Sequence, residues 1–288
     1  MNDSYVPPAF AAHSEVEPPD VLYHYTGQTG LLGIVENAEL WATKVRYMND
    51  ETEFNHALTA ADEILDGRIA DENTTLARKL ACVTLRRSLQ GLEDINIFAT
   101  CFCEDGDLLS QWRGYTAEGG GVAIGFDSRG LKSAATAAGF ILGKCIYDAE
   151  TQRRVVTEAI EHCVAEEIAG RNNWAFHGPL ADVIFRIGAF FKDSTFSEEK
   201  EWRLVSPVIM FRDERMNFRR GKSMVTPFYK LPILHESSLP IHHAVVGPCP
   251  NMELAKSAVT MLLMQHGSHG PLYGRPITFG SKIPFRNW

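Results

Sequence analysis

The chain has 288 residues, of which 45% are hydrophobic and 22% are charged, and its net charge is -8. That is enough to bury a sizeable core, in one large domain or two tightly packed ones. An acidic chain is not expected to bind nucleic acid non-specifically as a whole. A local exception is one basic cluster, formed by Arg212, Arg215, Arg219, Arg220 and Lys222. No run of about 18 apolar residues is present, so we expect no membrane span.

The six cysteines contain no CxxC pair, so the zinc-ribbon signature is missing. Cys101 and Cys103 alternate with Phe102 in an apolar run, and we interpret them as packed thiols, not metal ligands. We therefore expect no metal. The acidic, proline-containing N-terminus lacks the basic and apolar regions of a signal peptide. Together these features favour reduced thiols and a cytoplasmic location.

The first part of the chain alternates short strands and helices. Residues 1–20 are predicted to form an extended N-terminal arm, because Pro7, Pro8, Pro18 and Pro19 disfavour helix. A strand at 21–26, a turn at 27–30, a short helix at 31–37 and a strand at 39–43 then form a compact unit that places His24 near a strand end. Two helices follow at about 51–65 and 74–89, the second with Leu76, Leu80 and Val83 turned inward.

The remainder has more strands than helices. Residues 95–103 contain almost no polar side chain and are predicted to form a central strand. Further strands are predicted at 119–126, 141–147, 201–205, 208–211, 223–229, 243–248 and 276–280, and helices at 108–114, 150–170, 174–192 and 253–265. The elements show no βαβ rhythm, so we expect an α+β fold with mostly antiparallel or mixed sheets. Residues 21–288 are predicted to form a single domain with helical insertions.

The acidic stretch from Phe196 to Val205 offers paired carboxylates. Glu199 and Glu201 are two residues apart, so an extended backbone would place both on one face and Trp202 on the other. Two carboxylates at close range resist ionising together, as acid and base groups of active sites often do. The alternative is a solvated acidic start of a strand, with Lys200 as a neighbour.

Two other segments have side chains suited to ligand binding. In Tyr23–Thr26, a histidine and a threonine can bond a ribose or an amide, although a structural histidine explains the same pattern. In Ser110–Tyr115, helical spacing places Trp112 and Tyr115 on one side, where they can stack on a planar heterocycle, and Arg113 can pair with phosphate. The alternative is a surface helix anchored by its aromatic residues.

These segments resemble a large bacterial family known only as a domain of unknown function. The resemblance is carried by Tyr23–Tyr25, Met48–Asp50 with Glu53, Leu109–Tyr115, Gly121–Phe126, Glu199–Arg203, Phe218–Gly221, Gly247–Pro248 and Ser281–Arg286. The order of elements also resembles the ADP-ribosyltransferase fold, especially toxins that modify DNA bases.

The second resemblance implies a set of roles in NAD chemistry. His24, Tyr25, Thr26 and Asn49 would bind NAD, Trp112 or Tyr115 would stack on nicotinamide, and Arg46 or Arg113 would hold the pyrophosphate. Glu201 would be the catalytic carboxylate, with Glu199 as the upstream member of the pair and Arg46 as a further catalytic arginine. Such a carboxylate stabilises the oxocarbenium-like state that forms when the nicotinamide–ribose bond breaks.

We therefore expect an NAD-dependent ADP-ribosyltransferase, acting as a toxin or phage-defence effector on RNA, DNA or protein. An antitoxin or chaperone protein is an expected partner. Two alternatives remain open at this point: an NAD glycohydrolase, and a non-catalytic nucleotide-binding module on the same fold.

Overall fold

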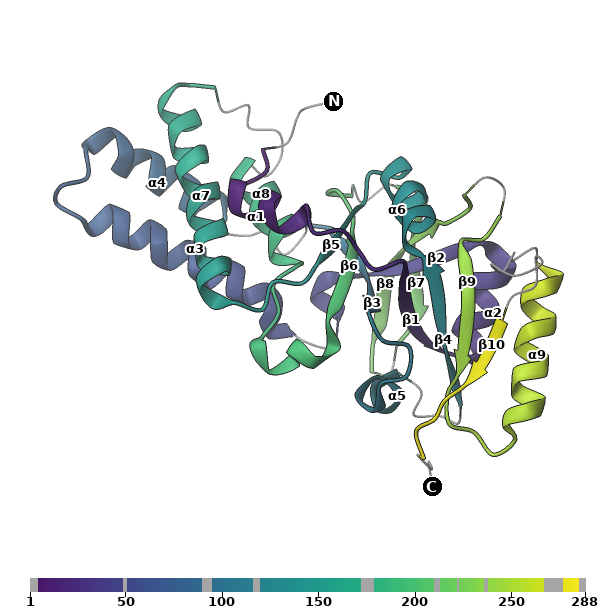
Figure 1. Cartoon of the computed structure of the whole chain (residues 1–288). Helices are drawn as coiled ribbons and strands as arrows, with labels where there is room; N and C mark the ends of the chain where they lie inside the picture. Colours follow the sequence, from purple (N-terminus) through teal and green to yellow (C-terminus); the bar gives the residue numbers. More distant parts are fainter. Residues whose placement is uncertain are drawn as a thin grey trace.

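The computed structural model describes residues 5–48, 51–89, 95–115, 120–171, 179–209, 213–221, 223–235, 238–266 and 277–284. Figure 1 shows a twisted sheet with a group of helices at one end and helix α9 (Met252–Gln265) at the other. The predicted mixture of helices and strands is confirmed, and Asn49 lies outside the described residues.

The described strands form one ten-stranded sheet with the order β10-β9-β4-β1-β3-β2-β8-β7, to which β6 and β5 add beside β3. The bounds are β1 Val21–Gly27, β2 Glu39–Lys44, β3 Phe98–Cys103, β4 Gly121–Asp127, β5 Ile141–Lys144, β6 Glu201–Val205, β7 Met216–Arg220, β8 Val225–Pro232, β9 Ile241–Val246 and β10 Ile277–Gly280. The paired strands run antiparallel except β9 and β10, which are parallel and joined by α9. The expectation of a mostly antiparallel, mixed sheet is confirmed.

Strand β3 is the centre of the sheet and has a forked edge. One edge pairs with β6 along its whole length, from Ala99 opposite Val205 to Cys103 opposite Glu201. The other edge is shared, because β1 meets it only at Cys103 and β2 only at Phe98 and Ala99. Between these two contacts β1 and β2 diverge, and the middle of β3 has a strand partner on one side only.

The two faces of β3 pack against different parts of the protein core. The Cys101 face, defined by Ala99, Cys101 and Cys103, meets the helical layer at Ala99. The Phe102 face, defined by Phe98, Thr100 and Phe102, packs into a second core that continues across the sheet. Helices α2 (Gln28–Asn37), α6 (Ser128–Ala137) and α9 contribute Leu31, Leu131 and Leu263 to that second core.

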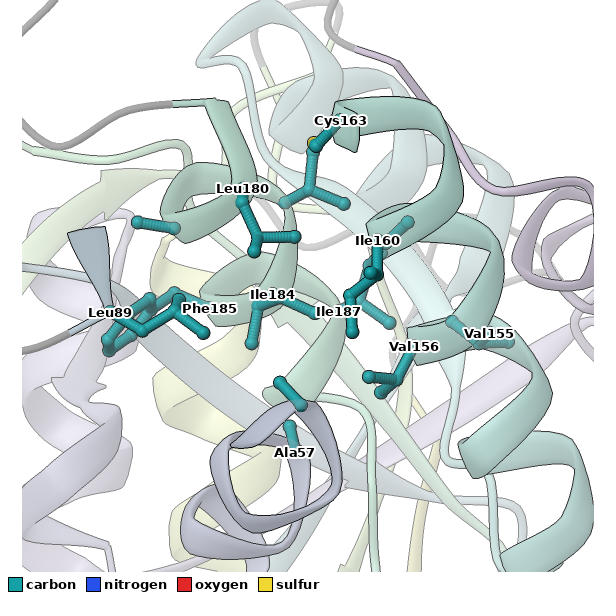
Figure 2. Packing of buried hydrophobic residues seen from close by; sticks show 14 of the residues in the cluster. Ala57, Leu89, Val155, Val156, Ile160, Cys163, Leu180, Ile184, Phe185 and Ile187 are labelled. Carbon is teal, nitrogen blue, oxygen red and sulfur yellow. The ribbon is translucent and has the colours of Figure 1, made fainter. Parts of the chain in front are cut away.

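The helical layer consists of α1 (Pro8–Ser14), α3 (Glu51–Ala70), α4 (Leu76–Ser88), α7 (Ala149–Ile168) and α8 (Pro179–Gly188). Ile160 of α7 and Ile184 of α8 are almost fully buried in one cluster with Ala57 of α3. Figure 2 shows these side chains interdigitating between the three helices. Close contact is required here, since a Cβ on Gly188 would lie 2.8 Å from the Cβ of Ala57.

The expected extended arm is wrong, because Pro8–Ser14 forms helix α1. Proline is tolerated in the first turn of a helix, where its missing N–H has no intrahelical acceptor. The helix is held by α7: the Ala9 N–H donates to Glu158 Oε2 at 2.7 Å, and the Tyr5 ring stacks on His162. Phe10 is buried against Phe190. Tertiary contacts thus outweigh the proline-rich composition.

Two further details differ from the expectations. Helix α6 was not predicted, although Asp127 caps it by accepting the Gly130 N–H at 2.7 Å. In α4 the inward face was misassigned: Leu76 and Leu80 are 72% and 59% exposed, and the buried residues are Ala81, Cys82 and Leu85. Helical spacing fits both sets of positions, and only packing against α3 and α7 selects the second.

Three further observations concern disulfides, membrane-spanning helices and metal ligands. All six cysteines are free. None of the helices in the described ranges has the length and apolar content that crossing a bilayer would require. Among the same residues, no three side chains of His, Cys, Asp or Glu gather as a metal ion would need.

Because Leu85 is buried and Leu80 is exposed, the same Leu→Ala substitution should affect stability strongly at position 85 and weakly at position 80. Leu85→Ala should lower the free energy of unfolding by about 2–5 kcal/mol, because it leaves a cavity in the helical layer. Leu80→Ala removes the same atoms from an exposed position and should change it by no more than about 0.5 kcal/mol. Urea unfolding of both variants measures the difference, and equal losses would contradict the packing described.

Candidate functional site

The glutamate pair lies where a short 3-10 helix, Ser194–Glu199, turns into β6. Asp193 caps this helix by accepting the Thr195 N–H at 2.8 Å. Lys200 then takes a left-handed conformation with φ of 42°, which reverses the backbone before the strand begins. The two glutamates are therefore not on one extended segment as predicted, yet their carboxylates converge on one partner.

That partner is Lys192, whose ammonium nitrogen lies 2.5 Å from Glu201 Oε2 and 3.1 Å from Glu199 Oε2. Arg203 approaches Glu201 from the other side, with its Nε 2.7 Å from Oε1 and its Nη2 3.2 Å from Oε2. The buried polar cluster of Lys192, Glu199, Glu201 and Arg203 thus contains two cations and two anions. Its charges cancel.

Burial decides how each carboxylate can act. The Glu201 and Glu199 side chains are 4% and 19% exposed. Burial alone would raise the pKa of Glu201, but the charges of Arg203 and Lys192 and hydrogen bonds from Arg203 and Cys101 lower it to about 2. Glu201 is therefore ionised and saturated with donors. Glu199 is the member of the pair that a ligand can reach.

The backbone around the cluster fixes its geometry. Lys192 follows α8, and its carbonyl and that of Ile146 both accept the Gln152 amide, at 3.0 and 2.6 Å. The Arg203 Nη1 donates to the Ala189 carbonyl at 2.7 Å. The Tyr147 hydroxyl accepts the Glu201 N–H at 2.8 Å. The cluster therefore joins β6 to the end of α8 and to the segment after β5.

Two side chains on the Cys101 face complete the site. The Cys101 thiol donates to Glu201, and burial keeps its pKa well above the ordinary value. Tyr115 is 46% exposed as a residue. Desolvation of its phenol and the negative charges of both glutamates raise the pKa of the phenol, so Tyr115 stays protonated and can donate a hydrogen bond.

Helix α5 (Leu109–Tyr115) carries Tyr115 and is fastened by buried groups. Trp112 is fully buried, its ring packs edge-on against Tyr25 at 4.7 Å, and its Nε1 donates to Asp107 at 2.8 Å. A Cβ on Gly247 would lie 2.9 Å from the Trp112 ring. The structure thus gives Trp112 a packing role, and no face of its ring is open to stack on a ligand.

Tyr25 and Thr26 also have structural contacts. Tyr25 is 5% exposed, and its hydroxyl donates to the Asp105 carbonyl and accepts the Leu108 N–H, both at 2.9 Å. It therefore holds the loop that precedes α5. Thr26 is half-buried against α2, where a Cβ on Gly30 would lie 1.9 Å from its Oγ1.

His24 lies near the glutamates but not beside them. Tyr23, Cys103 and Glu201 are in one row across β1, β3 and β6, so the His24 and Glu201 backbones are about 10 Å apart. His24 is opposite Ile124, on the Phe102 face, whereas Glu201 is on the Cys101 face. Strand β3 therefore separates the imidazole from the carboxylate.

The two predicted arginines do not join the cluster. Arg46 is exposed in the 3-10 turn Val45–Tyr47, beyond the point where Val45 bonds Ile97. This is about 20 Å along β3 from the end that holds Glu201. Arg113 is on the exposed side of α5.

The residues that sequence reasoning missed are Lys192, Arg203, Cys101 and Tyr147. The place of Arg203 in the site could have been predicted from the sequence, because strand alternation puts it on the same face as Glu201. The place of Lys192 could not, since only the packing of α8 brings it to β6.

Comparison with known proteins gives a family match over part of the chain. Residues 111–204 match a family described as "Protein of unknown function (DUF2971)". This range includes Lys192, the glutamate pair and all of α5 except its first two residues. No curated protein and no solved structure gives a significant match to the chain.

The charge cluster predicts how stability depends on pH. The folded-state pKa of Glu201, about 2, lies below its unfolded value of 4.5. Its contribution is therefore complete above about pH 4.5 and is lost as pH falls towards about 2. Glu201→Gln, which leaves Lys192 and Arg203 without that charge, should lower the free energy of unfolding at pH 7 by about 3–5 kcal/mol.

Urea unfolding across pH 2–7 tests this prediction. The gap between wild type and Glu201→Gln should narrow as the pH falls below about 4.5, while the exposed neighbour variant Glu198→Gln should match wild type throughout. A gap that does not vary with pH would contradict the assigned ion pairs.

Proposed function

We propose that this protein is an NAD-dependent ADP-ribosyltransferase, acting as a toxin or phage-defence effector on nucleic acid or protein. The observation that supports this most is the convergence of Glu199 and Glu201 on Lys192, near enough to Tyr115 for their charges to raise its pKa. Cleavage of the nicotinamide–ribose bond builds positive charge on the ribose, and a nearby carboxylate stabilises it. A protonated phenol can meanwhile orient a ribose hydroxyl or the nicotinamide amide.

The two glutamates would divide the work. Glu199, partly exposed and with its charge shared with Lys192, would face the ribose and act as the catalytic carboxylate. Glu201, saturated by Arg203, Lys192 and Cys101, would be a positioning residue that fixes Lys192 and the start of β6. This reverses the order of importance that the resemblance implies.

A second candidate function is a non-catalytic nucleotide-binding module. Its support is the neutrality of the cluster, because two cations already compensate the carboxylates that would otherwise stabilise a cationic transition state. The two functions make different predictions for NAD. An enzyme releases nicotinamide, whereas a binding module is stabilised by NAD and leaves it intact.

Incubation with NAD labelled in the adenosine part, plus separate pools of RNA, DNA and protein, tests the proposal. A transferase should release nicotinamide and label one pool. Release without labelling means water is the acceptor, which indicates an NAD glycohydrolase. A rise in melting temperature with intact NAD would favour the binding module. If NAD is neither cleaved nor raises the melting temperature, both functions are refuted.

Substitutions in the cluster should separate the roles of its members. Glu199→Gln should lower the rate of nicotinamide release about 10²- to 10³-fold, since it removes the charge that faces the ribose. Tyr115→Phe should lower it about tenfold through loss of one hydrogen bond. Glu198→Gln, one residue away and exposed, is the matched control and should retain the wild-type rate.

A melting curve for each variant shows that it is folded. Full activity in folded Glu199→Gln would remove Glu199 from the reaction.

A further inference from the structure

Strands β2, β8 and β7 carry a group of flat side chains on the Cys101 face of the sheet. Thr43 is paired with Ala99 of β3 on one side and with Phe228 of β8 on the other, so all three side chains lie on that face. Trp41 lies two residues before Thr43, and Arg219 of β7 is paired with the residue two before Phe228. Alternation therefore puts Trp41 and Arg219 on the same face.

Direct contacts join these side chains in a row. The Trp41 and Phe228 rings stack, with their centroids 4.4 Å apart and 29° between their planes. Phe228 is the cross-strand neighbour of Thr43, whose Oγ1 accepts a hydrogen bond from Arg219 Nη2 at 2.9 Å. The Arg219 side chain thus reaches across β8 to β2 and ends beside the aromatic pair. We call Trp41, Thr43, Phe228 and Arg219 the β2–β8 platform.

The aromatic part of the platform is ready to stack on a ligand. Trp41 is 39% exposed, whereas its stacking partner Phe228 is 3% exposed. Helices α2 and α6 pack on the opposite face, in the second core, and do not cover the indole. Because the buried Phe228 ring fixes the orientation of Trp41, little side-chain freedom remains to be lost when a planar group stacks on the indole.

Arg219 gives the platform a positive charge that is not neutralised. Over the described ranges, no carboxylate forms an ion pair with its guanidinium. Partial burial lowers the pKa of Arg219, so an added anion would be favourable there. Arg215, on the same stretch, instead pairs with Asp213 at 3.1 Å. A guanidinium with donors to spare is the group that best matches a phosphate.

The spacing of the platform identifies the ligand class. Trp41 and Thr43 are about 7 Å apart along β2, so the indole and the guanidinium serve two ends of one small molecule. A nucleotide has this form, because one sugar links its flat base to its phosphate. The platform is separate from the glutamate cluster: Thr43 is opposite Ala99 and Glu201 is opposite Cys103, about 13 Å further along β3.

We propose that the β2–β8 platform binds a nucleotide, with its base stacked on Trp41 and its phosphate held by Arg219 and the Thr43 hydroxyl. Stacking tolerates any base, since every base has a π face. The nucleotide can be free or part of a single strand, whereas a duplex keeps its bases paired and stacked. The site does not depend on NAD cleavage. A role in holding a single-stranded acceptor would follow from it, and only that role rests on the function proposed above.

Calorimetric titration of the full chain with uridine 5′-monophosphate, uridine and inorganic phosphate tests this site. Uracil is chosen because NAD does not contain it. Wild type should bind the nucleotide more tightly than either fragment. Trp41→Ala should weaken nucleotide binding about tenfold or more and leave phosphate binding unchanged. Arg219→Gln should weaken nucleotide and phosphate binding about tenfold, because a charge-assisted bond is lost, and leave uridine binding unchanged.

Two substitutions on the other face of β7 are matched controls. Phe218→Ala removes an aromatic side chain that is 64% exposed, and Arg220→Gln removes a charge. Alternation turns both side chains away from the platform, so both variants should bind as wild type. Trp41→Phe keeps a ring that can stack and should retain most of the affinity. Melting curves confirm that each variant is folded, so that a loss of binding is not a loss of structure.

A short single-stranded oligonucleotide, and the duplex of the same sequence, identify the source of the nucleotide. If the ligand is part of a strand, the single strand should bind more tightly than the nucleotide, and Trp41→Ala should weaken it. Binding of the nucleotide without binding of the strand indicates a free nucleotide.

Three results would overturn the proposal. These are no binding of the nucleotide or the strand at millimolar concentration, equal losses in Trp41→Ala and Phe218→Ala, and a duplex that binds as tightly as the single strand. Intact NAD together with nucleotide binding on the platform would refute the enzyme and leave this site standing. Cleavage of NAD without nucleotide binding would refute this site alone.

Discussion

The ion pairs of Glu201 are the constraint on which the site depends. A carboxylate at 3% exposure costs several kcal/mol to remove from water, and only opposite charges at short range can compensate this. Arg203 comes from the same strand, whereas Lys192 comes from the end of α8. The sheet and the helical layer must therefore meet in one arrangement for the charge to be buried. Apolar side chains of the same volume in place of these charged groups could hold the same elements together, but they could not orient Glu199.

The fork beside β3 is the second organising feature. A strand edge that no neighbour covers exposes backbone groups, and these need another partner. His24 supplies one at the Cys101 carbonyl, while Arg219 donates to Thr43 on the opposite face of the sheet.

Helix α5 is anchored in a small third cluster of buried residues, which includes Trp112, Tyr25 and Cys103. Asp107 accepts hydrogen bonds from Trp112, Ser281 and the Lys282 N–H, so one carboxylate joins α5 to the C-terminal segment. The aromatic residues that suggested ligand stacking are placed differently: Trp112 is fully buried and anchors the helix, whereas Tyr115 is 46% exposed. A seven-residue helix is too short to be stable alone, and it needs this anchoring.

The sequence by itself determined the α+β class, the central strand β3 and the position of β6. The alternation of side chains and the apolar content are local properties of the sequence. They predict an element correctly where the element is buried on a defined face. Tertiary structure alone decided that Pro8–Ser14 is helical, that Leu85 and not Leu80 faces the core, and that Lys192 neutralises the glutamates. These outcomes depend on contacts between residues far apart in the chain, such as Ala9 with Glu158. No local sequence pattern indicates which distant residue a given side chain will contact.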